Sequence, residues 1–515
     1  MAVDDVSLSV NRNEILCVVG ESGSGKSVMA KSILGLLPAP QVRVVGGRIE
    51  FEGRDLLQAS EAEMREVRGG RISMIFQEPM VALNPLMKVG QQIDEGFRVH
   101  TNMTPRERRA RVIELFTDVH LPESERIVNS YPHELSGGQR QRVMIAMALA
   151  LEPALIIADE PTTALDVTTQ AQILALLKEL QAKHGTAVLF ITHDFGVVAE
   201  IADRVVVMRH GKLIEAGDTA QVLRTPKEDY TKALVAAVPS LVPRHAAYED
   251  KLVPALELNG LDKTYGGRAS FFGGHSREVH AVRAVSLQVP RGHSLALVGE
   301  SGSGKSTLAR CIVGLETPDG GEILLDGENI AGLSRKALKP YRHLVQMVFQ
   351  DPFTSLNPRH RVGDIIALGP ILRGMPHKDA WDKARELLSL VGLQPDALSR
   401  YPHEFSGGQR QRIGIARALA TEPTLILADE PVSALDVSVQ KQVLDLLDGL
   451  RQSLNLSMLF ITHDLRVAAH VCDDVAVMRH GEIVERGSTS EIFANPKHEY
   501  TRQLLDSVPG KFWEH

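Results

Sequence analysis

The sequence predicts an α/β protein that contains two copies of one domain, each built around a parallel β-sheet. The first observation is an internal repeat, in which residues 2–27 resemble residues 281–306. The second is a series of short apolar runs, such as EILCVVG and SLALVG, that end in glycine or in polar residues, as buried parallel strands do. Because such strand ends gather at one edge of a sheet, we expect a ligand site there.

The repeat extends over almost the whole chain. YPHELSGGQRQR at Tyr131 matches YPHEFSGGQRQR at Tyr401, and IIADEP and LFITHD recur at the same offset of 270 residues. We therefore predict a first domain at residues 1–238 and a second at residues 252–515, each ending in a similar helical tail. Residues 239–251 contain two prolines and no sustained periodicity, which is typical of a linker. A helical period from about Pro85 to Asn129 predicts a small inserted helical subdomain.

Composition excludes several classes of protein. The 515 residues include 57 basic and 64 acidic side chains, which gives a net charge of −7. The chain therefore lacks the excess of basic residues that is typical of bulk nucleic-acid binding. The hydrophobic content of 43% argues against a disordered chain. The three cysteines are far apart, so neither a disulfide framework nor a cysteine-ligated metal site is expected. No apolar run approaches the roughly 18–20 residues that span a bilayer, and we expect a soluble intracellular protein.

The string GESGSGKS occurs at residues 20–27 and again at residues 299–306, each time after an apolar run. It fits the P-loop, in which glycines let the backbone N–H groups approach phosphate oxygens closely. Lys26 and Lys305 can reach the β- and γ-phosphates, and the hydroxyls of Ser27 and Ser306 can coordinate Mg²⁺. The alternative, a glycine-rich turn with a surface lysine, does not account for two such matches.

Acidic residues end another pair of predicted strands. Asp159 and Asp429, in IIADE and ILADE, can hold Mg²⁺ through water. The adjacent Glu160 and Glu430 can polarise an attacking water. An isolated acid at a strand end is as often a solvated or helix-capping group. Its repetition beside a P-loop favours the catalytic interpretation.

Histidine and glutamine complete the predicted cluster. His193 and His463 follow the runs LFIT and can contact the γ-phosphate or orient the water, although a lone histidine there is more often structural. Gln77 and Gln350 can bind Mg²⁺ or water, although a loop glutamine is often merely polar surface. In both cases repetition supports the functional interpretation.

The segments SGGQ at residues 136–139 and 406–409 predict a second helix start able to bind an anion. Because the P-loop already serves one side of the phosphates, this start is expected to serve a nucleotide from the opposite side. As a bare string SGGQ also fits a capped turn. Between a P-loop and an acidic pair, twice, it is among the strongest signals in the chain.

Together these motifs resemble the ATP-binding cassette (ABC) family over nearly the whole chain. The resemblance implies two tandem P-loop ABC nucleotide-binding domains, each a RecA-like α/β core with antiparallel β and α-helical subdomains. It also implies an ATPase whose cassettes pair head to tail, so that residues 20–27 share a nucleotide with residues 406–409, and residues 299–306 share one with residues 136–139.

Carried over residue by residue, the resemblance implies two hydrolytic sites that use ATP and Mg²⁺. The first copy supplies ATP contacts from Gly20, Glu21, Ser22, Gly23, Ser24, Gly25, Lys26, Ser27, Gln77, Ser136, Gly137, Gly138 and Gln139. The second supplies Tyr265, Gly299, Glu300, Ser301, Gly302, Ser303, Gly304, Lys305, Ser306, Thr307, Gln350, Ser406, Gly407, Gly408 and Gln409. The implied Mg²⁺ ligands are Ser27, Gln77, Asp159, Ser306, Gln350 and Asp429, and the implied catalytic residues are Glu160, His193, Glu430 and His463.

One position departs from the family pattern. Tyr265 matches the aromatic residue that stacks on adenine, and the first copy, which begins at the equivalent of Ala281, has no counterpart for it. Either the true start lies upstream, or the first site binds ATP on a weaker adenine platform. Loss of such stacking costs about 1–3 kcal/mol in nucleic-acid systems, which can weaken affinity roughly tenfold.

The tails TPKEDYTKALVAAVP and NPKHEYTRQLLDSVP resemble the C-terminal segment of peptide- and nickel-importer ATPases. The resemblance implies the fused ATPase subunit of a dipeptide/oligopeptide/nickel-type importer, with two permease chains, a solute-binding protein and a peripheral position on the cytoplasmic face of the inner membrane. No cysteine lies near either tail, so no iron–sulfur cluster is expected. The alternative is a soluble tandem-cassette ATPase acting on ribosomes or nucleic acid. Against it, the linker is short and no zinc-finger cysteines appear, so no direct nucleic-acid partner is expected.

Overall fold

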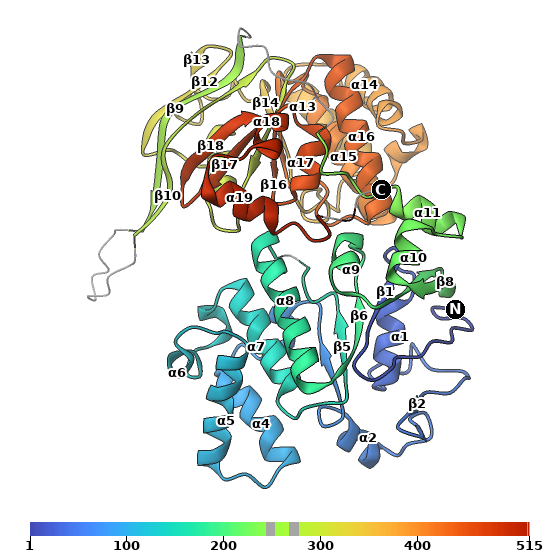
Figure 1. Ribbon diagram of the computed structural model, residues 1–515. Coiled ribbons are helices and arrows are strands. Elements are labelled where there is room, and N and C mark those ends of the chain that lie inside the picture. The colour runs from blue at the N-terminus through green and yellow to red at the C-terminus, as the bar shows by residue number, and fades with distance from the viewer. Residues whose placement is uncertain (164, 244–252, 267–277, 512, 514–515) are drawn as a thin grey trace. The chain divides into compact units, whose positions relative to one another are not determined.

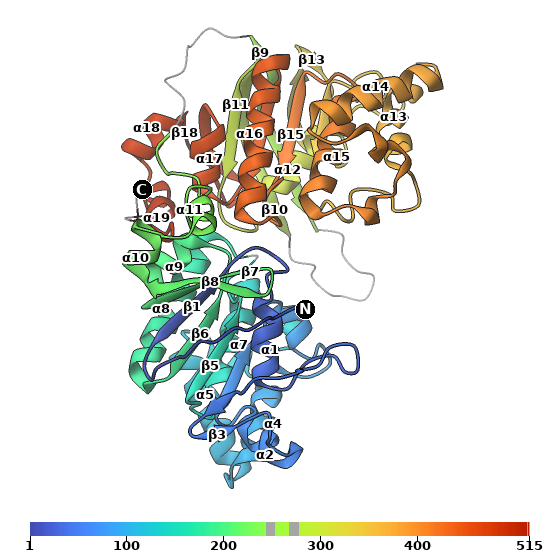
Figure 2. The ribbon, with the colours of Figure 1, turned by 90° about the vertical axis from the view of Figure 1, so that its right-hand side faces the viewer.

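The computed structural model describes residues 1–515 except 164, 244–252, 267–277, 512 and 514–515. The chain divides into two compact units, Met1–Ala237 with Val508–His515, and Val238–Ser507. Both units are α/β, which confirms the predicted fold class (Figures 1 and 2). The predicted boundaries stay a prediction, and residues 244–251 of the predicted linker lie outside the described part of the chain.

The first unit is built on a six-stranded sheet of order β4-β5-β6-β1-β7-β8. Only β8 runs antiparallel to its neighbour. Both Val18 of β1 and Asp159 of β5 pair with Ile191 of β6, so these three strands end at the same edge. The strands are β1 (Ile15–Val19), β4 (Ile72–Ile75), β5 (Leu155–Asp159), β6 (Ala187–Ile191), β7 (Arg204–Arg209) and β8 (Lys212–Asp218), with the small pair β2 (Glu50–Phe51) and β3 (Arg54–Asp55).

Helices flank this sheet, and the predicted helical insertion is present as α4 (Val89–His100), α5 (Pro105–Asp118) and α6 (Ser124–Ile127). α5 begins where Thr104 and Glu107 form a capping box, and it buries Val112, Leu115 and Phe116. The other helices are α1 (Lys26–Ile33), α2 (Glu61–Val67), α3 (Pro79–Ala82), η1 (Pro132–Glu134), α7 (Gly137–Leu149), α8 (Val167–His184), α9 (Phe195–Ile201), α10 (Thr219–Arg224) and α11 (Asp229–Val235).

The second unit repeats the same sheet in the order β14-β15-β16-β11-β17-β18 and adds an antiparallel sheet of order β10-β9-β12-β13. Its strands are β9 (Pro254–Tyr265), β10 (Val279–Pro290), β11 (Ser294–Val298), β12 (Gly320–Leu325), β13 (Glu328–Asn329), β14 (Val345–Val348), β15 (Leu425–Asp429), β16 (Ser457–Thr462), β17 (Asp474–Arg479) and β18 (Glu482–Ser488). Its helices are α12 (Lys305–Ile312), α13 (Val362–Leu372), α14 (His377–Leu390), η2 (Pro395–Ser399), η3 (Pro402–Glu404), α15 (Gly407–Leu419), α16 (Val437–Leu454), α17 (Leu465–Val471), α18 (Thr489–Ala494) and α19 (Glu499–Asp506).

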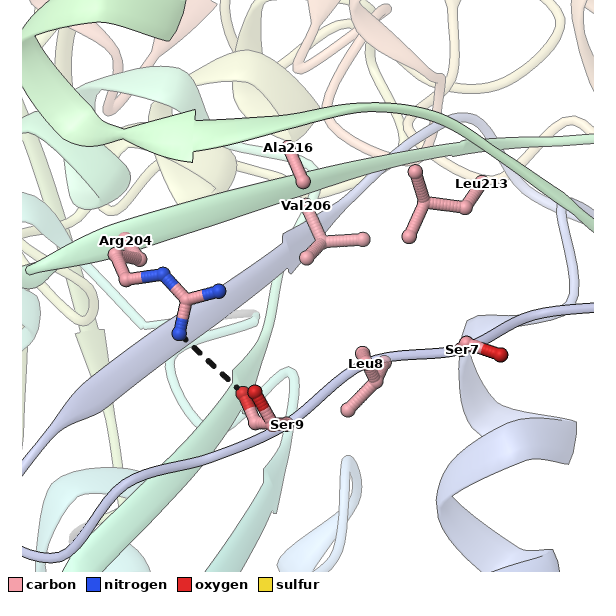
Figure 3. Close-up of a pocket in the computed structure, with 7 residues that line it drawn as sticks. All are labelled: Ser7, Leu8, Ser9, Arg204, Val206, Leu213 and Ala216. Atoms are coloured by element: carbon pink, nitrogen blue, oxygen red, sulfur yellow. Dashed lines mark hydrogen bonds between the residues drawn. The ribbon is translucent and has the colours of Figure 1, made fainter. Parts of the chain in front are cut away.

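The two units differ at their first segments. β10 pairs with β9, whereas the corresponding residues 2–11 of the first unit form no strand among the described residues. They run beside β7 and β8, and Arg204 donates a hydrogen bond to the Ser9 carbonyl over 3.4 Å (Figure 3). A shallow pocket lies there, lined by Ser7, Leu8, Ser9, Arg204, Val206, Leu213 and Ala216. None of these residues belongs to the predicted ATP site.

The last described residues of the chain fold as part of the first unit. Trp513 is buried and stacks on Phe195 of α9, with the ring centroids 6.5 Å apart. The Gly510 N–H donates to the Glu200 carboxylate over 3.4 Å, and a Cβ at Gly196 would lie 2.7 Å from the Pro509 carbonyl oxygen. The repeat in the sequence gave no indication of this placement.

Candidate functional site

In each unit the P-loop joins a central strand to a helix, between β1 and α1 and between β11 and α12. Gly25 and Gly304 precede the two helices with φ angles of 101° and 111°. A Cβ at Gly304 would lie 2.1 Å from the carbonyl oxygen of Ala281, and one at Gly25 would lie 2.4 Å from that of Ala2. These positions therefore require glycine for both conformation and space.

Replacing Gly304 by alanine is expected to weaken MgATP binding at the second P-loop at least about fivefold, because strained backbone costs of order 1–3 kcal/mol. Nucleotide titration of the purified protein measures this effect. Gly449→Ala is the matched control, since Gly449 is an exposed position in α16 with no atom within 4 Å of an added Cβ. Equal affinity of the two variants would contradict the steric argument.

The P-loop lysines are buried and fold onto their own loops. Lys26 Nζ donates to the carbonyls of Gly20, over 2.6 Å, and Glu21, over 3.0 Å. Lys305 Nζ donates to its equivalent carbonyls, both over 2.8 Å. Because a charged phosphate oxygen is a stronger acceptor for an ammonium than a neutral carbonyl, these lysines can turn from the loop to a bound phosphate.

Oxygen atoms suited to Mg²⁺ meet beside the first P-loop. Ser27 Oγ, in the first turn of α1, donates to Asp159 Oδ1 over 2.9 Å. Burial raises the pKa of Asp159 despite this hydrogen bond. At Asp429, burial and the nearby charge of Glu430 raise the pKa to about 6. Mg²⁺ prefers hydroxyl and carboxylate oxygens as ligands, so Ser27 and Asp159 fit the predicted metal site.

The glutamates that follow these aspartates have an unusual backbone. Glu160 and Glu430 lie in the left-handed region, with φ angles of 49° and 45°. Each N–H donates over 2.9 Å to the strand that ends alongside, at Ile191 or Ile461. A left-handed conformation costs a non-glycine residue about 1–2 kcal/mol, and at these positions the hydrogen bond to the neighbouring strand holds it.

Each of these glutamates binds the predicted glutamine and histidine of its own cassette. Glu160 accepts a hydrogen bond from Gln77 Nε2 over 2.9 Å and lies 3.3 Å from His193 Nδ1. In the second cassette Gln350 Nε2 donates to Glu430 over 2.7 Å, and His463 Nδ1 lies 3.1 Å from it. The three groups follow three adjacent strands, whose common edge brings them together.

The histidines influence the charge of the glutamates. Burial tends to raise the pKa of Glu160 and Glu430, but the hydrogen bond and charge of the adjacent histidine outweigh it and hold both pKa values below the usual glutamate range. For His463, burial tends to lower the pKa, and the bond with Glu430 outweighs this and raises it. Both glutamates are therefore ionised at neutral pH, as a base must be.

The SGGQ segments begin helices α7 and α15, as predicted. Ser136 Oγ accepts from the Gln139 N–H over 3.2 Å, and the Gln139 side chain accepts from the Ser136 N–H over 3.0 Å. Ser406 and Gln409 form the same capping box. The helix N-terminus carries partial positive charge, which is the property expected of an anion site.

Two residues near the P-loops were not predicted. Tyr230 and Tyr500, in the tail helices α11 and α19, place their hydroxyls against Glu21 and Glu300 of the two P-loops. The signal was present as the repeated DYT and EYT of the tails. Tyr265, which was predicted, ends β9 with 37% of its surface exposed, and its role in adenine stacking stays a prediction.

Known families match both copies of the repeat. The family described as ABC transporter matches residues 3–163 and 282–433. The C-terminal region of the oligopeptide/dipeptide transporter family matches residues 214–263 and 484–511, which include both tails. This second match supports the importer over the alternative that acts on ribosomes or nucleic acid. In the described residues, no helix is long and apolar enough to cross a membrane.

Curated relatives match the chain almost completely. The glutathione import ATP-binding protein GsiA of Salmonella paratyphi A is 47% identical over 99% of this chain and 86% of the relative. The protein of the same name from Escherichia coli K12 has the same identity and coverage.

Among solved structures, cbiO1 of Clostridium perfringens is 27% identical with a TM-score of 0.40, over 50% of this chain and 94% of that one. The dimeric ATP-binding cassette MJ0796 bound to ADP and Pi is 29% identical with a TM-score of 0.41, over 45% and 98%. The family matches and the relatives together show that the chain belongs to the ABC transporter family, as the fused two-cassette ATP-binding subunit, an ATPase, of a peptide-type importer.

Proposed function

We propose that each cassette binds MgATP at its P-loop and hydrolyses it with Glu160 or Glu430 as the general base. The observation that carries this proposal is the hydrogen-bonded set of glutamine, glutamate and histidine, formed twice at the sheet edge beside a P-loop. Mg²⁺, when bound to the serine and aspartate oxygens, would supply positive charge that offsets the charge of the phosphates.

The residues around this base then have separate roles. The P-loop N–H groups and Lys26 or Lys305 bind the phosphates and fix their orientation. The ionised glutamate accepts a proton from the attacking water, and the strained backbone at its Cα fixes the direction of its carboxylate. His193 or His463 positions that carboxylate through the hydrogen bond at Nδ1.

We further propose that the SGGQ segment of each cassette completes the nucleotide site of the other. The support is the family membership, together with the presence of both a P-loop and a capped SGGQ helix in each copy. ATP bound in this way favours closure of the cassettes, and hydrolysis removes the link. A permease that binds a surface of the cassettes would be moved when they close, and the free energy of ATP binding and hydrolysis would reach it in this way.

As an importer ATPase, the chain acts with membrane permease chains. We propose two of them, together with a solute-binding protein, and a peripheral position on the cytoplasmic face of the cell membrane. The proposed contact surface is the pair of segments that follow Gln77 and Gln350, at residues 78–90 and 351–363. In the first segment Val81 and Leu86 are 79% and 86% exposed, so their side chains are accessible to a partner chain.

Cysteine cross-linking in the assembled complex tests this surface. Val81→Cys is expected to cross-link to a permease chain when the subunits are expressed together in membranes. Val45→Cys, at a valine of the same unit that is 70% exposed, is the matched control and is expected to remain unlinked. Cross-linking that is absent at both positions, or equal at both, would count against the proposed contact.

We propose that the cargo is a small peptide such as glutathione, because the similar proteins are named for glutathione import. Uptake assays with labelled glutathione, dipeptides and nickel in cells that express the whole transporter distinguish these solutes. We expect saturable uptake of glutathione or dipeptides that stops when both Glu160 and Glu430 are replaced by glutamine. Uptake of nickel alone would refute the proposed cargo.

A further inference from the structure

The tail helix of each cassette places one tyrosine hydroxyl against the start of the P-loop. In the second cassette the hydroxyl of Tyr500, in α19, accepts a hydrogen bond from the Glu300 N–H over 3.0 Å. In the first cassette the hydroxyl of Tyr230, in α11, donates to Glu21 Oε2 over 3.2 Å. Glu21 and Glu300 are each the second residue of a GESGSGKS loop. The same contact region is thus formed twice.

An arginine at a strand end holds each tyrosine ring. The Arg479 guanidinium lies 4.6 Å from the ring centroid of Tyr500, and that of Arg209 lies 4.5 Å from the ring of Tyr230. These arginines end β17 and β7, which pair with the strands that lead into the two P-loops. Tyr500 is only 2% exposed. Cation–π contact and burial therefore fix where the hydroxyl points.

The tail helix itself is anchored to the central sheet. Glu485 of β18 accepts hydrogen bonds from the N–H groups of Lys497, over 2.7 Å, and His498, over 3.0 Å, just before α19. In the first cassette Glu215 of β8 accepts from the N–H groups that precede α11 in the same way. The sheet thus sets the position of each helix start, and the helix sets the position of the tyrosine.

We propose that Tyr500 and Tyr230 are positioning residues that hold the P-loops in the shape that binds MgATP. The inference rests on the proposed role of residues 20–27 and 299–306 as nucleotide loops. The Tyr500 hydroxyl holds its loop at the Glu300 N–H, and the Tyr230 hydroxyl holds its loop at Glu21, to whose carboxylate it donates. Burial and the charge of Glu21 raise the pKa of Tyr230 to about 12, so its hydroxyl keeps the proton that it donates. The transporter-type tail thereby contributes to nucleotide binding within its own cassette.

Hydroxyl deletion in proteins with one disabled P-loop tests this role. With Lys26→Ala, the Lys305 site dominates binding, and Tyr500→Phe is expected to weaken MgATP affinity roughly two- to tenfold, the range that one hydrogen bond supplies. In that background Tyr230→Phe has the smaller effect, and with Lys305→Ala the order reverses. Displacement of a fluorescent ATP analogue from the full-length protein measures the affinities. Tyr341→Phe, at a half-buried tyrosine that packs against the core of the same unit and outside the predicted ATP contacts, is the control without effect.

Kinetics separate a positioning role from a general structural one. Tyr500→Phe is expected to raise the KM for ATP while kcat at saturating ATP and the melting temperature stay unchanged, because phenylalanine keeps the ring and its contact with Arg479. Proportional loss of kcat with a lowered melting temperature would overturn the inference. An unchanged affinity of Tyr500→Phe in the Lys26→Ala background would also overturn it, provided that adding Lys305→Ala to that background abolishes the remaining binding. If the protein with both Lys26→Ala and Lys305→Ala still bound MgATP, the nucleotide assignment itself would fail.

Discussion

Replacement of both Glu160 and Glu430 by glutamine is expected to reduce ATP hydrolysis at least about 100-fold, while MgATP remains bound. General bases contribute about 10²- to 10⁴-fold to rates, and an amide has nearly the shape of a carboxylate but cannot accept the proton. The pKa of Asp429 is raised mainly by burial and also by the charge of Glu430, and the substitution removes this second contribution. Phosphate release under steady-state conditions, together with nucleotide retained after rapid gel filtration, measures both halves of the expectation.

The chain offers a closely matched control for this pair. Glu152 and Glu422 occupy equivalent positions of the two copies and also have left-handed backbones, with φ angles of 51° and 55°. Their carboxylates bind basic side chains, Arg111 and Lys383, outside the predicted sites. The double change of these two to glutamine is expected to leave hydrolysis near wild type. Near-normal hydrolysis in the Glu160 and Glu430 double variant would instead refute the assigned base.

Replacing Ser406 by arginine is expected to abolish hydrolysis at the site of Lys26, in the other cassette. An arginine removes the N-cap of α15, which costs about 0.5–2 kcal/mol, and fills the space where the helix start would approach phosphate. The experiment uses Glu430→Gln, so that the remaining hydrolysis comes from the first site. In that background Ser406→Arg should eliminate most phosphate release, and Ser136→Arg should have a much smaller effect.

The same experiment in a Glu160→Gln background tests whether each SGGQ segment serves the other cassette. With Glu160→Gln in place of Glu430→Gln, Ser136→Arg becomes the damaging change and Ser406→Arg the mild one. Melting temperatures of the four proteins check that the loss of a cap has not unfolded them. Equal effects in both backgrounds, or effects in the same cassette as the substitution, would overturn the crosswise arrangement.

Much of the fold follows from local sequence patterns. Apolar runs that end in glycine or in polar residues predict β1, β5 and β6, because parallel strands are buried on both faces. The helical period predicts the inserted subdomain, and SGG predicts the start of α7, because serine is a good N-cap. Each of these predictions is stronger because the same pattern occurs in both copies of the repeat, where a chance match is less common.

Other features depend on contacts that no local pattern contains. The hydrogen bond from the Glu300 N–H to the Tyr500 hydroxyl joins residues 200 positions apart. The left-handed backbone of Glu160 follows from its bond to the end of β6 and not from a propensity of glutamate. Placement of Trp513 in the first unit depends on complementary packing against α9, which a repeat cannot reveal because the repeat treats both copies alike.

That placement has a consequence for attempts to divide the protein. The polypeptide passes from the first unit to the second after Ala237 and returns after Ser507. The first unit is therefore made of two segments that are far apart in the sequence. A single protease cut within residues 244–252 would yield an N-terminal piece that lacks the segment ending in Trp513, and a C-terminal piece that carries it. If the sequence were split there into two genes, the first product would lack Trp513. That tryptophan is buried in the first unit, so the first product would depend on the second to complete its own fold.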